Sequence, residues 1–285
     1  MTAATGTTGS AVIADHSIEI TGKDVAALGR VAAHFAPGTA VNVTYLGNES
    51  LSARIEACRA AREHGFRPVP HLSARRITGE AELRQFLSAL RDVGTNEEVF
   101  VIGGDPPEPL GPYDDALALI RTGLLQEYGV RHVGITGYPE GHPHIDDSAL
   151  WDALEHKIAA VTEQSMRVSV TTQFGFTSET VIQWIELVRR RGITVPIRVG
   201  VPGPASVKRL LGYARRFGVK SSAGIVGKYG ISLTRLVGSA GPDRFIDSLA
   251  SRLTPDHGPV LVHFYTFGDP AATAAWVSAR KKRIR

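Results

Sequence analysis

An apolar run turns into a stiff polar loop in the stretch His132-Val133-Gly134-Ile135-Thr136-Gly137-Tyr138-Pro139-Glu140-Gly141-His142-Pro143. The two prolines exclude a helix interior and a central strand from its second half. The chain therefore leaves a strand after Gly137 and displays a phenol, a carboxylate and an imidazole on the loop that follows. Polar clusters at the carboxyl end of a strand are where α/β folds usually keep their chemistry. The alternative is a rigid turn whose Glu and His side chains are only solvated.

The same succession of strand, loop and helix recurs along the whole chain. Short runs rich in β-branched and aromatic residues alternate with longer segments whose apolar residues recur at helical spacing. Strands are expected at 17–21, 40–45, 67–72, 98–104, 132–137, 167–174, 195–200 and 259–265. Helices are expected at 25–32, from about 50, at 80–93, from about 114, and at 148–161, 178–191, 205–217, 231–237 and 242–253.

This alternation predicts a fold of the α/β class. It favours parallel pairing of the strands, and eight strand–helix units favour a closed (β/α)8 TIM barrel. We expect a flexible N-terminus at 1–12 and a single barrel domain at 13–285, with extra helices before the last strand. A doubly wound open sheet is the second candidate. It would normally carry a Gly-rich dinucleotide loop after an early strand, and the sequence contains neither a GxGxxG nor a Walker motif.

Composition describes a soluble globular protein. The 285 residues are 43% hydrophobic and 21% charged, which gives ample material for a core. The net charge of +4 suits an anionic small ligand as well as nucleic acid. The single cysteine, Cys58, excludes a disulfide framework, and it shares an apolar helical stripe with Leu51 and Ile55. We therefore expect Cys58 in the core.

The sequence shows no targeting or membrane segment. Residues 1–10 lack the charged start of a signal peptide, and no apolar run approaches the length of a membrane span. We expect a cytoplasmic protein with no membrane or nucleic-acid partner. The basic tail at 280–283 is interpreted as a solvated helix end. No helix shows an unexplained apolar face, so the sequence favours no particular oligomeric state.

Polar residues lie in or just after the expected strands, and in a barrel such residues converge on one mouth. They are Glu19, Thr44, His71, Asp105, Tyr138, Gln173 and Tyr265. Glu19 lies between Ile18 and Ile20, which face the other way by strand alternation, so its carboxyl group is expected to point into the barrel. Burial there would raise its pKa until it holds a proton near neutral pH. The alternative is a Glu in an internal salt bridge.

Two of these residues suit a flat heterocyclic ligand. Two glycines precede Asp105 and allow a ligand to approach the backbone closely, although Asp is also common as a cap of a turn or helix. Gln173 is followed by Phe174 and Phe176, and an amide beside aromatic rings matches a heterocycle with paired donors and acceptors. A satisfied core amide is almost as good an interpretation of Gln173.

The histidines are weaker candidates. His71 lies between a proline and a leucine, a setting more typical of a structural residue. The side chains of His142, His144 and Asp146 could ligate a metal ion, but their spacing fits no recognised metal motif. We expect no metal site.

Six short motifs appear in the order seen in methylenetetrahydrofolate reductases. They are Thr44-Tyr45, Pro70-His71-Leu72, Gly104-Asp105, Tyr138-Pro139-Glu140-Gly141-His142-Pro143, Thr172-Gln173-Phe174 and His263-Phe264-Tyr265-Thr266. They cover nearly the whole chain, and the Tyr-Pro-Glu-x-His-Pro element is the most specific. The sequence therefore resembles this family. The resemblance implies a (β/α)8 barrel that reduces 5,10-methylenetetrahydrofolate to 5-methyltetrahydrofolate, in one-carbon metabolism and methionine biosynthesis.

The resemblance also implies roles for single residues. Glu19 falls at the family's general acid, and Asp105 falls at the aspartate that faces the pterin and joins in catalysis. Gln173 falls at the folate-binding glutamine, with Phe176 and Tyr265 expected beside the substrate. The positions that match the family's flavin contacts are Thr44, His71, Tyr138, His142 and Lys157.

Several of the family's flavin anchors are replaced in this chain. The segment that usually reads Glu-Phe-Phe-Pro-Pro is Glu19-Ile20-Thr21-Gly22, and the arginine of the family's Arg-Gly-Asp is Gly103. The family's Asp, Asn and Arg in the helix before Lys157 are replaced by Leu150, Ala153 and His156. The folate-facing residues remain, whereas the phosphate and ribose anchors do not. The chain thus resembles the flavin-free members of the family, in which NAD(P)H would pass hydride directly to the folate and FAD would be absent.

Other functions remain open at this stage. They are an FAD-dependent reductase with altered anchors, a deazaflavin-dependent methylene-tetrahydropterin reductase, and a non-catalytic folate-binding barrel. We expect NADPH rather than NADH as hydride donor, because three cations near strand ends or loops could pair a 2′-phosphate. These cations are Arg75, Arg76 and Lys228.

Overall fold

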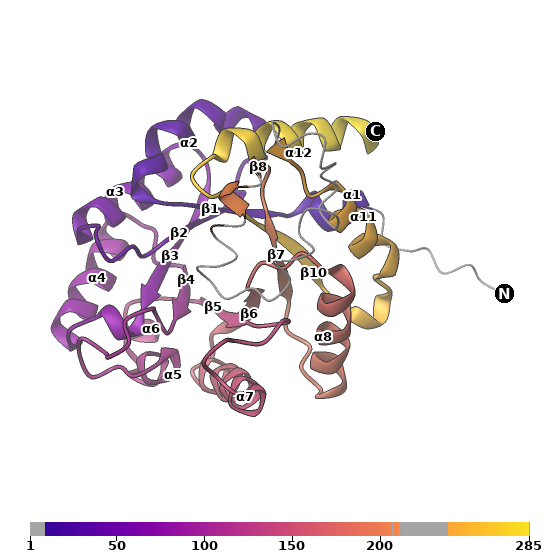
Figure 1. Cartoon of the computed structure of the whole chain (residues 1–285). Coiled ribbons are helices and arrows are strands. Elements are labelled where there is room, and N and C mark those ends of the chain that lie inside the picture. The colour runs from indigo at the N-terminus through magenta and orange to yellow at the C-terminus, as the bar shows by residue number, and fades with distance from the viewer. Residues whose placement is uncertain (1–8, 207, 211, 213–238, 285) are drawn as a thin grey trace.

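The computed structural model describes residues 9–206, 208–210, 212 and 239–284, and it contains a closed barrel of eight parallel strands (Figure 1). The strand order is β1-β10-β7-β6-β5-β4-β3-β2. The strands are β1 Ser17–Ile20, β2 Ala40–Val43, β3 Arg67–Ser73, β4 Glu98–Ile102, β5 His132–Gly137, β6 Arg167–Thr172, β7 Ile197–Pro202 and β10 Val260–Tyr265. The predicted (β/α)8 barrel is confirmed, and each expected strand end is right to within two residues.

Helices cover the outside of the barrel (Figure 1). They are α2 Val25–Val31, α3 Leu51–Glu63, α4 Glu80–Asp92, α5 Ala116–Ile120, α6 Leu124–Glu127, α7 Asp147–Glu163, α8 Ser178–Arg190, α11 Asp243–Arg252 and α12 Pro270–Ile284. Short 3-10 turns lie at Gly22–Asp24, Ala32–His34, Ala74–Arg76 and Pro255–His257. The helix expected from about 114 is split into α5 and α6, because Gly123 adopts a left-handed φ of 76° between them.

Two other segments differ from expectation. Helix α1, Gly9–Ala14, buries Val12 and Ile13 completely, so the N-terminus expected to be flexible up to residue 12 is helical from Gly9 onward. At the start of the helix expected at 205–217, β8 Ala205–Ser206 instead pairs antiparallel with β9 Ser239–Ala240, whereas 208–210 and 212 are helical as expected. Most of that expected helix, and the one expected at 231–237, lie outside the described residues.

Strand alternation separates an apolar outer layer from a polar barrel interior. Ile18 and Ile20 are 0% and 1% exposed in the layer between strands and helices. Ser17 and Asn42 are buried on the opposite side of their strands, where they meet His263. Cys58 lies in the outer core as expected, and burial raises its pKa to about 12. Within the described residues, no helix combines the length and apolarity needed to cross a membrane.

Candidate active site

Glu19 places a carboxyl group in the barrel mouth. It lies next to Asn42 in the register of β1 and β2. Its neighbours Ile18 and Ile20 occupy the outer layer, so the side chain faces inward, as strand alternation predicted. Burial raises the pKa of Glu19 to about 8, and the charge of Asp24 adds to the shift. A carboxyl group with this pKa keeps its proton at neutral pH and can donate it.

Two tyrosines share the mouth with Glu19. Burial raises the pKa of Tyr265 well above its usual value, and the charges of Glu19 and Tyr138 raise it further. Burial also raises the pKa of Tyr138. The Tyr265 hydroxyl donates to the Thr172 carbonyl oxygen at 3.1 Å and so ties β10 to β6. Both phenols therefore stay neutral at neutral pH.

Neutral histidines occupy the barrel interior beneath the mouth. His71 Nε2 lies 3.3 Å from the Asn42 side-chain oxygen, and burial lowers the pKa of His71 to about 3. The Asn42 amide donates to His263 Nδ1 at 3.4 Å, and the Ser17 hydroxyl lies 2.8 Å from the same nitrogen. His71 is thus tied into an interior hydrogen-bond network that joins β1, β2, β3 and β10. This fits the structural interpretation of His71.

Asp105 follows β4 and is held by Arg76, which lies in the 3-10 turn after β3. Its Oδ1 accepts a hydrogen bond from Arg76 Nε at 2.8 Å and lies 2.7 Å from Arg76 Nη2. The Asp105 side chain is 69% exposed. Gly104 adopts a φ of 104°, and a β-carbon there would lie 2.4 Å from Ser73 Oγ. Only glycine fits this turn, and the turn fixes the position of Asp105 after β4.

Gln173 directly follows β6, beside a wall of aromatic rings. Its side-chain oxygen accepts from the Phe174 amide at 3.0 Å. Phe174 packs against Phe176 with ring centroids 5.9 Å apart and against Tyr265 at 5.3 Å. This wall connects β6 with β10 and suits a flat ligand. Asp105 and Gln173 bond to separate partners here, so their joint contact with a pterin stays a prediction.

The other residues matched to flavin contacts have local partners. The Thr44 hydroxyl donates to the Ile20 carbonyl oxygen at 3.0 Å and braces β2 against β1. His142 Nδ1 accepts from the His144 amide at 3.2 Å, and burial lowers the pKa of His142. Among the described residues, no group of three or more His, Cys, Asp or Glu is placed to hold a metal ion. The absence of a metal remains a prediction.

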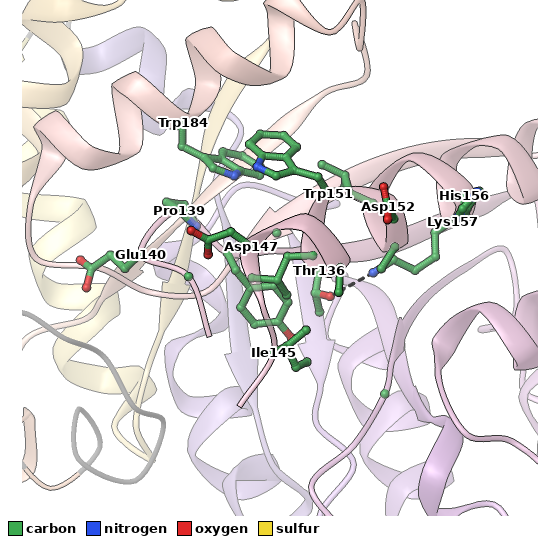
Figure 2. Close-up of a pocket in the computed structure, with 18 of the residues that line it drawn as sticks. Thr136, Pro139, Glu140, Ile145, Asp147, Trp151, Asp152, His156, Lys157 and Trp184 are labelled. Carbon is green, nitrogen blue, oxygen red and sulfur yellow. Dashed lines mark hydrogen bonds between the residues drawn. The ribbon is translucent and has the colours of Figure 1, made fainter. Parts of the chain in front are cut away.

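A cavity of about 640 Å³ lies between the end of β5, α7 and α8 (Figure 2). The stacked rings of Trp151 and Trp184 line it, with centroids 6.0 Å apart and an interplanar angle of 21°. Lys157 Nζ reaches in from α7 and donates to Thr136 Oγ1 at 3.4 Å. Burial lowers the pKa of Lys157 to about 8, so the amine still carries its charge at neutral pH but loses it at a lower pH than an ordinary lysine.

A comparison with known protein families matches residues 25–277, most of the chain, to the family described as methylenetetrahydrofolate reductase. The chain belongs to the methylenetetrahydrofolate reductase family. The resemblance inferred from the motifs is confirmed at this level. Membership supports a folate-related oxidoreductase that uses a nucleotide or flavin cofactor.

Several solved structures match most of the chain at low similarity. A dihydropteroate synthase from Thermus thermophilus is 13% identical, with a TM-score of 0.47 over 94% of this chain and 93% of that one. A dihydropteroate synthase from Coxiella burnetii, in complex with pteroic acid, is 12% identical, with a TM-score of 0.48 over 95% and 93%. A thermostable aldo-keto reductase is 11% identical, with a TM-score of 0.47 over 93% and 89%. Similarity at this level carries no conclusion about ligand or activity.

The cavity beside α7 does not fit the diphosphate and ribose of a flavin dinucleotide. Leu150 and Ala153 line it without polar side-chain atoms. Within the described part of the chain, Lys157 is the one lysine or arginine in its lining. Carboxylates, which repel a diphosphate, are more numerous there. They belong to Asp115, Glu140, Asp147 and Asp152.

The two arginines expected to pair with a coenzyme phosphate already have hydrogen-bond partners within the protein. Arg75 donates to the carbonyl oxygens of Pro106 at 2.9 Å, Asp114 at 3.0 Å and Pro107. Arg76 holds Asp105. Lys228 lies outside the described residues. The preference for NADPH therefore stays a prediction and gains no support from Arg75.

Sequence reasoning missed two features of the site. Asn42 lies between the buried Val41 and Val43, and the same period-two alternation that singled out Glu19 would have placed Asn42 inside the barrel. The stacked rings of Trp151 and Trp184 join α7 and α8. No local sequence pattern predicts a contact between residues on two different helices.

Proposed function

We propose that this methylenetetrahydrofolate reductase reduces 5,10-methylenetetrahydrofolate to 5-methyltetrahydrofolate with hydride taken directly from NAD(P)H, without a bound flavin. The observation that carries the proposal is Glu19, an inward carboxyl group whose pKa is raised to about 8. The reaction needs an acid at neutral pH, and this group holds a proton there. Support for the flavin-free branch comes from the cavity beside α7, where Leu150 and Ala153 replace polar flavin anchors.

Glu19 acts as the general acid in this proposal. It protonates N10 of the folate, and the bond between N10 and the methylene carbon breaks with its electron pair on N10. The methylene group is left as an iminium cation on N5. The nicotinamide supplies hydride to that carbon, which completes the methyl group and releases NAD(P)+. A positioned acid contributes roughly 10²–10⁴-fold to such a step.

Asp105 and Gln173 recognise the pterin. A pterin edge offers an N3–H and a 2-amino group as donors and a 4-oxo group as acceptor. A carboxylate only accepts, whereas a carboxamide both donates and accepts, so the two side chains together match that edge. Phe176 and Tyr265 belong to the aromatic wall beside Gln173 and would pack against the ring. The negative charge of Asp105 would also stabilise the developing iminium cation.

The test is a visible spectrum of the purified protein followed by a turnover assay. We expect no stoichiometric flavin absorbance, and oxidation of NAD(P)H that depends on 5,10-methylenetetrahydrofolate and is unchanged by added FAD. Stoichiometric flavin, or a rate that requires added FAD, would favour the FAD-dependent alternative. Turnover only with a reduced deazaflavin and another pterin would favour the deazaflavin-dependent reductase. Folate affinity without turnover would indicate a non-catalytic barrel.

A further inference from the structure

The loop that carries Asp105 is braced against the end of β3. The Arg75 amide donates to the Gly103 carbonyl oxygen at 2.8 Å, and the Leu110 amide donates to the Arg75 carbonyl oxygen at 2.8 Å. The Arg75 guanidinium adds its hydrogen bonds to three carbonyl oxygens farther along the loop. The two consecutive arginines thus have different partners. Arg75 bonds to the loop backbone, and Arg76 bonds to the Asp105 side chain.

Arg76 contacts Asp105 in an asymmetric way. Both Nε and Nη2 of Arg76 approach the same oxygen, Oδ1, at 2.8 and 2.7 Å. Within the part of the chain that the structure describes, Oδ2 has no hydrogen-bond partner. Arg76 itself is only 22% exposed, while Asp105 is 69% exposed. The arrangement fixes one oxygen of the carboxylate and leaves the other available to a ligand.

The Arg76 side chain is also fixed from the opposite side. A β-carbon added at Gly47, in the loop after β2, would lie 1.9 Å from Arg76 Nη1. The guanidinium therefore packs directly against the backbone of that loop. Gly47 has no left-handed φ, so glycine is needed here for space rather than for backbone conformation. Arg76 is held between Gly47 and Asp105, which links the loops after β2 and β4.

We infer that Arg76 is a positioning residue for folate recognition, because it fixes Asp105 through Oδ1 and leaves Oδ2 to accept from the pterin. The inference rests on the proposed function, which gives Asp105 its contact with the substrate. The competing view is that Arg76 and Asp105 form a surface ion pair without consequence for the substrate, as many such pairs do. The two views differ in which kinetic constant responds and in whether the response depends on Asp105.

Three variants separate geometry from charge. Arg76→Gln removes the charge, Arg76→Lys keeps it but loses the planar fork, and Gly47→Ala displaces the guanidinium while both partners remain. We expect each to raise the KM for 5,10-methylenetetrahydrofolate by up to about fivefold, the upper value for such a pair, to change kcat only through the altered position or charge of Asp105, and to leave the KM for NAD(P)H unchanged. Arg84→Gln is the matched control, because Arg84 forms exposed ion pairs with Glu80 and Glu127. It should leave all three constants unchanged.

A double-mutant cycle tests whether Arg76 acts through Asp105. Affinity for the product, 5-methyltetrahydrofolate, is measured by titration calorimetry without coenzyme for the original protein, Arg76→Gln, Asp105→Asn and the double variant. We expect Arg76→Gln to weaken binding when Asp105 is present and to change it by less than about twofold in the Asp105→Asn background. Equal affinities of the original protein and Arg76→Gln, or full additivity in the cycle, would overturn the inference alone. An original protein that neither binds nor forms 5-methyltetrahydrofolate would overturn the proposed function and the inference with it.

Discussion

In both the barrel mouth and the cavity beside α7, burial shifts the pKa of an ionisable group toward its neutral form, and we propose different parts of the family's chemistry for the two regions. In the mouth, burial raises the pKa of Glu19 to about 8 and keeps an acid protonated. In the cavity, burial lowers the pKa of Lys157 to about 8, which leaves the amine protonated at neutral pH. By the resemblance to the family, the mouth holds the residues expected to recognise folate, and the cavity holds the positions where flavin anchors are expected to be replaced. We therefore propose that folate recognition and flavin binding can be tested separately in the two regions.

The largest expected effect comes from Glu19→Gln, which keeps the shape of the side chain and removes the transferable proton. Turnover should fall by roughly 10²–10⁴-fold, because protonation of N10 loses its acid. Affinity for 5-methyltetrahydrofolate should stay close to that of the original protein. Steady-state kinetics and calorimetry check both points. Glu56→Gln on α3 is the control, since Glu56 forms an exposed pair with Arg59. Near-normal turnover in Glu19→Gln would remove Glu19 from the mechanism.

The next effect is a loss of folate affinity in Gln173→Ala. Removing the amide would leave buried polar groups of the pterin unpaired, which costs about 1–3 kcal/mol, or roughly ten- to a hundredfold. The KM for folate should rise by that factor while the KM for NAD(P)H stays nearly unchanged. Gln126→Ala, at an exposed position of α6, serves as the control. A selective effect on NAD(P)H would instead place the nicotinamide against β6.

The pH dependence should reveal the protonated form of Glu19. Because its pKa is raised from 4.5 to about 8, the active, protonated form predominates below pH 8 and is lost above it. The value of kcat/KM should therefore decline about tenfold per pH unit above 8. The same shift makes the free energy of unfolding decrease as pH rises from 4.5 to about 8. A profile that stays flat through pH 9 would mean that another group donates the proton.

Lys157→Met should have the smallest effect. The side chain is buried, and methionine fills a similar volume without the amine. If no flavin diphosphate binds beside α7, kcat and both KM values should stay nearly unchanged. The assay is repeated with and without added FAD. A large loss of activity that FAD partly restores would show that Lys157 still serves a flavin.

Much of the fold could be predicted from the sequence because its signals are local. Runs of β-branched and aromatic residues located the strands. Period-two alternation predicted that the Glu19 side chain faces the barrel interior. Helix α1 was missed because its six residues are too few to show a helical period, although Val12 and Ile13 are fully buried. The break between α5 and α6 depends on the left-handed backbone of Gly123 alone. It was not predicted, because the residues on both sides follow one helical pattern.

The candidate site was less predictable because its contacts join distant parts of the chain. The two glycines before Asp105 marked it as a candidate ligand-binding residue. Its partner Arg76 lies 29 residues earlier, so no local pattern predicts that contact. Arg75 and Arg76 were interpreted as phosphate ligands because a cation near a strand end is equally suited to a loop carbonyl or a carboxylate. Only the packing of β3 against β4 decides between those partners.

Direct hydride transfer is the central claim, and an isotope experiment tests it most directly. The reaction is run in ordinary water with NAD(P)H deuterated at C4, using each stereochemical label in turn, and the methyl group of the product is analysed by mass spectrometry. Direct transfer predicts that one of the two labels delivers one deuterium to the methyl group without loss. Transfer through a reduced flavin would pass the label to a nitrogen that exchanges with water. A methyl group free of deuterium with both labels would therefore contradict the account.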